Sequence, residues 1–223
     1  MPPTVFSPRF AARKRPRQKR SQIVVNRILA TATELFQQDG YAYVSTNRIA
    51  ESANVSIGSI YQYFANRESI ALAIYEAASS RAALAVKRQA IELMGLPLET
   101  AIRTHMHLLF DVAEKDRYAL FQILNEVPEL REAAEPISFD RLIHHAHYMF
   151  IQQHFSAADP LAISRKCYFI EKTVISAVGQ YLDERPDFLT REAAVAEVAQ
   201  FVHRYVTSLQ NEPAGGEEIP AAI

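Results

Sequence analysis

The stretch from Ser45 to Phe64 constrains the fold of this chain more than any other. Ser45 or Thr46 can cap a short helix, because a hydroxyl at this position accepts a backbone N–H of the first turn. A second short helix follows Asn54, a residue that tolerates the positive φ that a tight turn between helices needs. Apolar residues at helical spacing give both helices a buried face, namely Ile49, Ala50 and Ala53, then Val55, Ile60 and Phe64. The pattern predicts a helix-turn-helix, which suggests a protein that reads DNA.

The outward face of the second helix carries small polar residues and tyrosine instead of charges. It comprises Gly58, Ser59, Tyr61 and Gln62, with Ile57 at its flank. A face that meets only solvent normally carries Glu and Lys, as the polar sides of surface helices do. Small polar side chains and tyrosines suit close approach to a groove and its phosphates. This helix is therefore a candidate recognition helix.

The charge of the chain is divided unevenly along the sequence. Net charge is −1, but residues 1–70 hold 10 Lys and Arg against 4 Asp and Glu, whereas residues 71–223 hold 14 against 21. The basic charge lies with the helix-turn-helix, where phosphate contact would need it. Residues 1–21 contain early prolines and a dense basic run, so we expect a flexible arm. Two interpretations of this arm stay open, a solvated tail and an arm that reaches along a DNA groove.

Helical periodicity continues along the rest of the chain, and no segment alternates in the way a half-buried strand does. The spacing predicts helices over 22–38, 67–94, 97–113 and 116–126, one ending near residue 155, and two more that begin at about residues 160 and 190. With 49% apolar residues, the 223-residue chain can bury a substantial core. We therefore expect an all-α fold with a helix-turn-helix domain at 22–70, a larger helical domain at 71–209 and a frayed tail at 210–223.

A longer pattern at fixed spacing surrounds the helix-turn-helix. It consists of Gly40-Tyr41 followed by Thr46-x-x-Ile-Ala-x-x-Ala-x-Val-Ser-x-Gly-Ser-Ile-Tyr-x-Tyr-Phe-x-Asn-Arg-Glu-Ser-Ile. Over residues 22–74 the chain thereby resembles the N-terminal signature of TetR-family transcriptional regulators. It departs at Asn54, usually Gly in the family, and at Arg67, usually Lys. The resemblance implies an obligate helical dimer that binds a near-palindromic operator and releases it when a small molecule enters the C-terminal domain.

Eight positions become candidate DNA contacts through this resemblance. Positions that commonly hold phosphates are matched by Thr46, Tyr61, Tyr63 and Arg67. Base edges would be faced by Ser56, Ile57, Ser59 and Gln62. Hydroxyls and helix-start amides can bond phosphate oxygens, and Gln can pair with adenine through two hydrogen bonds. A plain cap or surface role is the alternative for each residue.

The larger domain is rich in aromatic residues and Met, which either fill a core or line an apolar pocket. Filling a core is the commoner role of such residues, and only the family resemblance favours a pocket. The candidate lining residues are Met106, Phe110, Phe121, Leu124, His147, Tyr148 and Phe169. A pocket of this composition would take an apolar or aromatic ligand, with fatty or acyl compounds among the candidates.

The last two helices carry apolar residues on more than one face, so each needs two packing partners. The resemblance implies an isologous four-helix interface in a homodimer. We expect this interface to contain Ile163, Ile170, Val174 and Val178, together with Val195, Val198, Val202 and Tyr205. Burial of the same residues within one chain is the alternative.

Other function classes lack their usual signals. The sequence has no glycine-rich phosphate loop, nucleophile elbow or paired carboxylates on a helix face, so an enzyme or carrier is the weaker hypothesis. The histidines lack a Cys or carboxylate at ligand spacing, so no metal and no cofactor is expected. A third hypothesis is a nucleoid-type protein that binds DNA without sequence preference through its basic arm.

Compartment signals favour the cytoplasm. The single cysteine, Cys167, cannot form an internal disulfide and reads as a small core thiol. Nothing near the N-terminus resembles a signal peptide, and charged residues interrupt every apolar run well before the roughly 20 residues that a membrane span needs. We therefore expect a soluble protein with no membrane partner.

Overall fold

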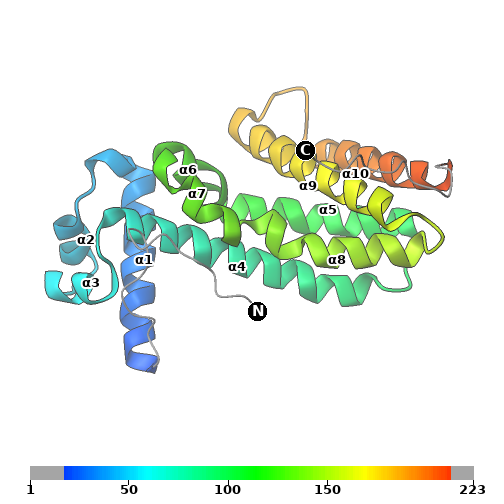
Figure 1. The fold of residues 1–223 in the computed structure, drawn as a ribbon. Helices are drawn as coiled ribbons and strands as arrows, with labels where there is room; N and C mark the ends of the chain where they lie inside the picture. The colour runs from blue at the N-terminus through cyan, green and yellow to red at the C-terminus, as the bar shows by residue number, and fades with distance from the viewer. Residues whose placement is uncertain (1–17, 212–223) are drawn as a thin grey trace, which may run out of the picture. The chain divides into compact units, whose positions relative to one another are not determined.

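The computed structural model describes residues 18–211, and every regular element among them is helical (Figure 1). The N-terminal elements are α1 (Lys19–Asp39), the 3₁₀ turn η1 (Tyr41–Tyr43), α2 (Thr46–Ser52), α3 (Ile57–Tyr63) and α4 (Arg67–Leu93). Then follow α5 (Leu98–Lys115), the π-helical turn η2 (Tyr118–Gln122), α6 (Ile123–Glu126), η3 (Pro128–Leu130), α7 (Arg131–Ala134) and η4 (Glu135–Ile137). The chain continues with α8 (Phe139–His154), α9 (Pro160–Glu184), α10 (Arg191–Thr207) and η5 (Ser208–Asn211). The all-α prediction is confirmed.

Local capping signals position the helix starts. Asn66 Oδ1 accepts the Ser69 N–H at 2.8 Å, and Ser69 Oγ in turn lies 3.2 Å from the Asn66 nitrogen, so the two residues cap α4 reciprocally. Asp159 and Thr190 each accept a first-turn N–H, at 3.1 and 3.2 Å, where α9 and α10 begin. These caps satisfy backbone donors that a helix start leaves unpaired. Their positions agree with those read from the sequence.

The helix ends differ in small ways from the expectation. Helix α1 begins at Lys19, so residues 19–21 of the expected arm are helical. It ends at Gly40, whose φ of 83° is the positive value expected of a cap, although its ψ of 142° lies outside the left-handed helical region. Gln210 and Asn211, expected in the tail, belong to η5. The remaining parts of the expected arm and tail, residues 1–17 and 212–223, lie outside the described residues.

The chain forms two compact units, and their boundaries differ from the expected ones. The first unit combines residues up to 81 with residues 116–139, and the second combines residues 82–115 with those from 140 onward. The expected division placed one boundary at residue 70. The helical spacing of apolar residues in α4 continues without a break past residue 70, so the sequence does not mark the true boundary. No local sequence pattern shows that residues 116–139 return to the first unit.

The core of the first unit joins the helices α1, α2 and α3 to two other segments. Helices α1, α2 and α3 contribute, among others, Ile28, Phe36, Ile49 and Ile60. Helix α4 adds residues such as Ile70 and Ile74. The returning segment adds Tyr118, Ala119, Ile123, Val127, Leu130, Ala133, Ala134 and Ile137. The helix-turn-helix is therefore stabilised by residues from beyond position 115, because burial of apolar surface is the main favourable contribution to folding.

The second unit is built mainly on the packing of α5 with α9 and α10. Phe110 of α5 is fully buried, and its ring centroid lies 5.7 Å from that of Tyr181 on α9. At the start of α10, Arg191 pairs with Asp111 and with Glu114, whose Oε2 lies 3.2 Å from the Arg191 Nε. Apolar packing and this ion-pair cluster together fix the register of α10 on α5.

Helix α4 is the one described helix that is long and apolar enough to cross a membrane by length and composition alone. The core helix of a soluble protein passes the same test, and 61% of the most apolar 18-residue window of α4 is buried inside the protein. Ile70, Ala71, Ile74 and Ala78 of this helix belong to the core of the first unit. Packing within the chain therefore accounts for the apolar composition.

Candidate nucleic-acid interface

Helices α2 and α3 form the helix-turn-helix that the sequence predicts. Ser45 Oγ accepts the Arg48 N–H at 3.2 Å and caps α2, and Ser56 Oγ accepts the Ser59 N–H at 3.1 Å and caps α3. Asn54, in the turn between them, has a φ of 50°, as the tight turn requires. The N–H of Val55 donates to the Ala50 carbonyl at 3.0 Å and closes the turn. Local hydrogen bonds thus determine how α3 leaves α2.

Several of the expected DNA contacts lie on the exposed side of this motif. Ile57 is 38% exposed and Tyr61 43% exposed, and Ser56 and Gln62 are exposed beside them. Ser59 is half-buried, and its Oγ lies 2.8 Å from the Ser56 Oγ. Five of the eight candidates, all on or at the start of α3, therefore lie on one short helix whose sequence contains no charged residue.

Thr46 joins this surface through a hydroxyl pair. It is the first residue of α2 and half-buried, and its Oγ1 lies 3.2 Å from the Tyr61 hydroxyl. The bond links the first turn of α2 to the exposed side of α3. Hydroxyls held in this way can donate to or accept from a phosphate oxygen with little further ordering.

Tyr63 does not belong to the exposed surface. Its side chain is only 6% exposed and packs in the core of the first unit. The helical period turns residue 63 inward beside Ile60, so the ring belongs to the core, and the expected phosphate contact of Tyr63 stays a prediction. Among the described residues, the Oγ of Ser79 is the one buried side-chain oxygen or nitrogen without a hydrogen-bond partner. The Tyr63 hydroxyl is therefore not a buried group that lacks a partner.

Arg67 is engaged inside the unit instead of projecting outward. Its Nη1 donates to the backbone carbonyls of Tyr41, Ala42 and Val44 at 3.0, 3.2 and 3.0 Å. Its guanidinium carbon lies 4.0 Å from the centroid of the Tyr41 ring, within cation–π range. The half-buried Arg67 thus holds η1 against the start of α4. Its expected phosphate contact stays a prediction, and the structure adds a second role, the support of the segment that precedes α2.

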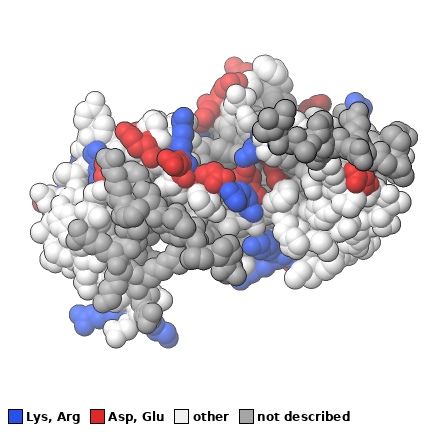
Figure 2. All heavy atoms as spheres, in the orientation of Figure 1, with Lys and Arg blue, Asp and Glu red and all other residues white. Residues whose placement is uncertain are grey.

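The described part of the motif carries little basic charge of its own. Lys19 and Arg20 are exposed where α1 begins. Figure 2 shows basic side chains at the lower left of the view, where the lower end of α1 lies in Figure 1. On α2, Arg48 is exposed but paired with Asp39 at 2.7 Å. Five of the ten basic residues among the first 70 precede residue 18. Half of the basic residues among the first 70 thus precede the described part of the chain, whereas α3 offers hydroxyl, amide and apolar groups.

Comparisons with known proteins agree with this geometry. A family model described as bacterial regulatory proteins of the tetR family matches residues 28–74. Residues 28–74 thus match the DNA-binding domain of the tetR family, and this match supports a DNA-binding transcriptional regulator with a helix-turn-helix domain. Comparison by sequence with curated proteins gives no match.

Solved structures of tetR-family proteins share the fold over most of their length. The fatty acid degradation regulator FadR from Bacillus halodurans is 16% identical with a TM-score of 0.63, over 84% of this chain and 96% of that one. A TetR-family transcriptional regulator from Streptomyces coelicolor is 20% identical with a TM-score of 0.57, over 83% and 99%. The repressor AlkX from Dietzia sp. strain DQ12-45-1b, implicated in biodegradation of n-alkanes, is 15% identical with a TM-score of 0.54, over 84% and 95%.

The seven candidate ligand residues are not brought together within one unit. Phe121 and Leu124 belong to the first unit, and the other five belong to the second. Met106 and Phe110 are buried core residues, and His147 and Tyr148 are half-buried. Phe169 is 55% exposed on α9, and its assignment as a pocket wall stays a prediction. Aromatic composition alone did not distinguish core, surface and pocket.

A polar network that the sequence did not predict crosses the second unit. His105 Nδ1 lies 2.8 Å from the Gln89 Oε1, and His105 Nε2 lies 3.0 Å from His147 Nε2. His147 Nδ1 and His144 Nδ1 lie 3.0 Å from the two carboxylate oxygens of Glu171. Glu171 is only 6% exposed. The network joins α4, α5, α8 and α9 through residues that are far apart in sequence.

Two groups in or beside the network, His105 and Cys167, favour their uncharged forms. Burial, with a smaller contribution from the neighbouring His147, lowers the pKa of His105 to about 3. Burial, followed by the nearby Glu171 carboxylate, raises the pKa of Cys167 to about 12, so the thiol stays protonated. No group of three or more His, Cys, Asp or Glu within residues 18–211 is arranged to hold a metal ion.

The residues expected at the dimer interface mostly face the interior of their own chain. Ile163, Ile170, Val174, Val178, Val195 and Val202 are each at most 7% exposed, and Val198 and Tyr205 are half-buried. Their place in a dimer interface stays a prediction, and within the single chain the side chains of the buried six already pack between α5, α9 and α10. Exposed apolar rings lie on other faces of the same helices, with Tyr168 and Phe169 each 55% exposed on α9 and Phe201 42% exposed on α10.

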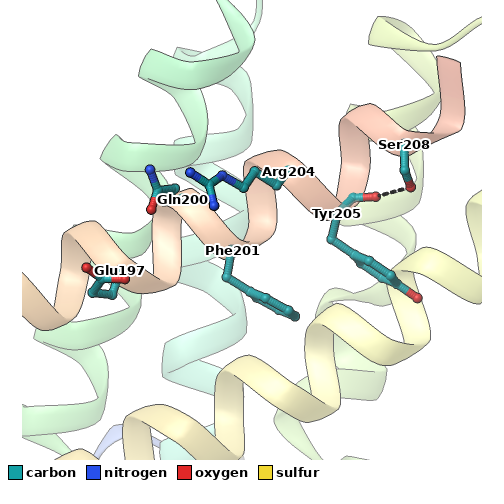
Figure 3. A pocket seen from close by; sticks show the side chains of 6 residues that line it. All are labelled: Glu197, Gln200, Phe201, Arg204, Tyr205 and Ser208. Carbon is teal, nitrogen blue, oxygen red and sulfur yellow. Dashed lines mark hydrogen bonds between the residues drawn. The ribbon is translucent and has the colours of Figure 1, made fainter. Parts of the chain in front are cut away.

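The exposed face of α10 is slightly hollowed (Figure 3). An open hollow of about 450 Å³ is lined by Glu197, Gln200, Phe201, Arg204, Tyr205 and Ser208. The rings of Phe201 and Tyr205 are stacked, with centroids 5.9 Å apart and planes 6° from parallel. Lys166 of α9 lies over the Tyr205 ring, with its Nζ 4.1 Å from the ring centroid. The hollow thus has an aromatic floor between an acidic and a basic residue.

Proposed function

We propose that this tetR-family regulator is a homodimeric, sequence-specific repressor that leaves a near-palindromic operator when it binds a small apolar ligand. The observation that carries the proposal is the exposed face of α3. It offers a side-chain amide, two hydroxyls and an aliphatic group, and its helix contains no charged residue. A surface of this kind suits base edges more than it suits phosphates alone.

Each residue of the motif has a chemical role in this proposal. Gln62 pairs with a base edge, and Ser56, Ile57 and Ser59 complete the contact within the major groove. Thr46 and Tyr61, already joined by their hydroxyls at 3.2 Å, bond phosphate oxygens at the edge of the groove. Two copies related by a two-fold axis would enter successive major grooves about one helical turn apart. The operator is therefore expected to be an inverted repeat.

The proposal is tested by gel shifts with DNA from upstream of the gene and from its neighbours, against unrelated DNA of equal length. We expect a saturable complex with one site whose affinity exceeds that for unrelated DNA by about a thousandfold or more, and which weakens as salt rises. Equal affinity for all sequences would favour the nucleoid-type alternative. Absence of any salt-sensitive complex would rule out both.

The proposed dimer uses the exposed aromatic faces of α9 and α10. Tyr168, Phe169 and Phe201 leave apolar ring surface uncovered within the chain. Along α10, Glu197 and Arg204 flank Phe201 at similar distances in the sequence. If two copies of α10 cross in antiparallel fashion near Phe201, each Glu197 meets the partner's Arg204, so the surface complements itself. Dimerisation along this face would bury the rings.

The proposed ligand is an apolar molecule such as a fatty or acyl compound. The second unit is rich in aromatic and aliphatic side chains, and two proteins of similar fold are described by fatty acid degradation and by n-alkane biodegradation. A thermal-shift screen with fatty acids and acyl thioesters of graded length tests this. A ligand is accepted if it raises the melting temperature and also releases the operator. Stabilisation by short polar acids alone would contradict the proposed class.

We propose that the protein acts in the cytoplasm, where operator DNA is present and the environment is reducing. The buried, protonated Cys167 thiol is compatible with such a compartment. The proposed activity is regulatory, and no catalytic step is assigned to any residue.

A further inference from the structure

We propose that Glu126 of α6 is a positioning residue for the helix-turn-helix. It holds the backbone N–H of Tyr41 and thereby fixes the segment from which α2 begins. The inference rests on the DNA-binding role of the first unit and extends it to a residue that lies on none of its DNA-facing helices. The supporting contacts all lie within the first unit.

The hydrogen bond joins residues that are 85 positions apart in the sequence. Glu126 Oε2 accepts the Tyr41 N–H at 2.8 Å and the Tyr118 hydroxyl at 3.3 Å. Tyr41 is the first residue of η1, and its preceding Gly40 ends α1. One carboxylate oxygen therefore connects the exit of α1 to the returning segment. Charge-assisted bonds of this kind are shorter and stronger than those between neutral groups.

The backbone carbonyls in and after η1 are held by a hydrogen-bond donor, whereas Glu126 acts as an acceptor. Arg67 donates to the carbonyls of Tyr41, Ala42 and Val44, as described above. The Tyr41 hydroxyl also donates to Glu68 Oε1 at 3.0 Å. Arg67 thus holds acceptors of this segment, whereas Glu126 holds a donor. With both in place, the backbone before α2 has little freedom to move.

The short distance along the chain makes this position matter for DNA reading. Only Val44 and Ser45 separate the end of η1 from the first residue of α2. Val44 is fully buried, and Ser45 is the cap of α2. A shift of η1 would therefore displace Thr46 and, through the α2–α3 packing, the recognition surface itself. Misplacement of about 1 Å is enough to spoil contacts that depend on hydrogen-bond geometry.

The π-helical turn helps Tyr118 to meet Glu126. In a regular α-helix, residues eight apart differ in direction by about 80°, given 3.6 residues per turn. The wider π turn over Tyr118–Gln122 rotates the chain less per residue and brings the two side chains toward one face. π turns are uncommon and tend to occur at functional sites. Here the turn brings a second donor to the carboxylate that holds Tyr41.

The test compares Glu126→Ala, Glu126→Gln and the control Glu132→Ala in the full chain. Glu132 is an exposed carboxylate on α7, a few residues further along the same segment. Operator affinity is measured by fluorescence anisotropy at several salt concentrations, and the Tyr41 amide is followed by ¹H–¹⁵N NMR and hydrogen exchange. Thermal melting of each variant checks that it is folded.

Glu126→Ala is expected to weaken operator binding about fivefold or more, corresponding to one lost hydrogen bond, with an unchanged salt slope. Removal of a negative charge should by itself strengthen binding to DNA, so a weaker complex points to geometry. Glu126→Gln keeps an acceptor and is expected to restore most of the affinity. Glu132→Ala is expected to bind at least as well as the unchanged protein. The Tyr41 amide should shift and exchange faster only in Glu126→Ala.

The inference is overturned if Glu126→Ala binds the operator as tightly as the control, or if its Tyr41 amide is unchanged. It is also overturned if Glu126→Gln loses as much affinity as Glu126→Ala, because charge and not the acceptor would then matter. Lack of operator binding by the unchanged protein would instead refute the proposed function, since the Tyr41 amide readout does not depend on DNA.

Discussion

Arg67 shows how a residue at a family position can serve a different purpose in its own structure. Sequence position alone suggests a phosphate contact, because a cation at a helix start beside a recognition helix is well placed for DNA. The structure has the same guanidinium nitrogen bonded to three backbone carbonyls and the side chain stacked on Tyr41. Three converging carbonyls arise only from the path of the backbone. Sequence reasoning had no means of detecting them.

Replacement of Arg67 by Ala is expected to destabilise the first unit. Three backbone carbonyls would lose their donor, two of them in the buried residues Tyr41 and Val44, and a hydrogen bond to a charged group is worth about 1.5–3 kcal/mol. Arg67→Lys should recover part of this stability, because an ammonium can satisfy some of the carbonyls without the planar fork. Urea denaturation measures the change. Unchanged stability together with weaker DNA binding would favour the phosphate role after all.

Gln62, unlike Arg67, is exposed, as the sequence predicted for a residue that contacts DNA. Gln62→Ala is expected to change which operator sequence is preferred, with a penalty of about 1–3 kcal/mol at the contacted base pair and little change in affinity for unrelated DNA. Tyr61→Phe serves as the comparison, because loss of a phosphate contact should weaken all sequences alike. Selection from randomised operators measures both. Identical preferences for Gln62→Ala and the unchanged protein would contradict direct readout.

Local signals were read correctly, and long-range ones were not. The helix starts near residues 67, 160 and 190 were predicted correctly, because caps such as Asn66, Asp159 and Thr190 need only their own side chain and the next three residues. Glu126 escaped notice because its partner Tyr41 is 85 positions away. Tyr43, 82% exposed just before α2, also escaped, because a single exposed ring leaves no periodic signal. The residues that support the recognition surface are therefore harder to predict than those on it.

At the level of elements, the sequence predicted where the helices lie. It did not predict which helix faces pack within the chain and which remain exposed. The stripe of Val195, Val198 and Val202 is the most regular on α10, and regularity suggested an interface. Two of these three valines are buried within the chain instead. The strongest apolar stripe of an amphipathic helix packs on its own core first. What remains for a partner is the less regular face with Phe201, Glu197 and Arg204.

The α10 face allows a charge-reversal test of the proposed dimer. Glu197→Arg and Arg204→Glu are each expected to weaken dimerisation about tenfold, because either change places like charges opposite each other across the two-fold axis. The double variant restores opposite charges and should recover much of the affinity. Analytical ultracentrifugation over a concentration series measures the dissociation constant. If the double variant is no better than the single ones, the antiparallel arrangement of α10 is incorrect.

At the level of the whole molecule, the division into two units is the feature that was hardest to predict from the sequence. Helix α4 continues through the boundary at residue 81, and residues 116–139 rejoin the first unit after α5. Eight buried side chains in that returning segment share a core with the helix-turn-helix. A sequence pattern shows which residues are apolar, but it does not show which unit they complete. The DNA-binding unit is therefore larger than its motif.

The buried histidine network makes the stability of the second unit sensitive to acid. His105 has a pKa near 3 in the folded chain, against an ordinary value of 6.5, because burial disfavours its charged form. Between these two values the unfolded chain binds a proton at this position and the folded chain does not. Stability is therefore fully present above about pH 6.5 and falls as the pH is lowered. The expected loss is about 2 kcal/mol at pH 5, at about 1.4 kcal/mol for each pH unit.

Denaturant unfolding from about pH 7.5 to about pH 5 measures this slope. His105→Gln removes the titrating ring while keeping polar atoms near Gln89 and His147, so it should flatten the slope even if it lowers stability overall. His145→Gln is the matched control, because His145 is exposed on α8 and lies outside the network. If both variants keep the slope of the unchanged protein, another group governs the acid sensitivity. A slope lost in His105→Gln alone would assign it to the enclosed ring that joins α5 to α4 and α8.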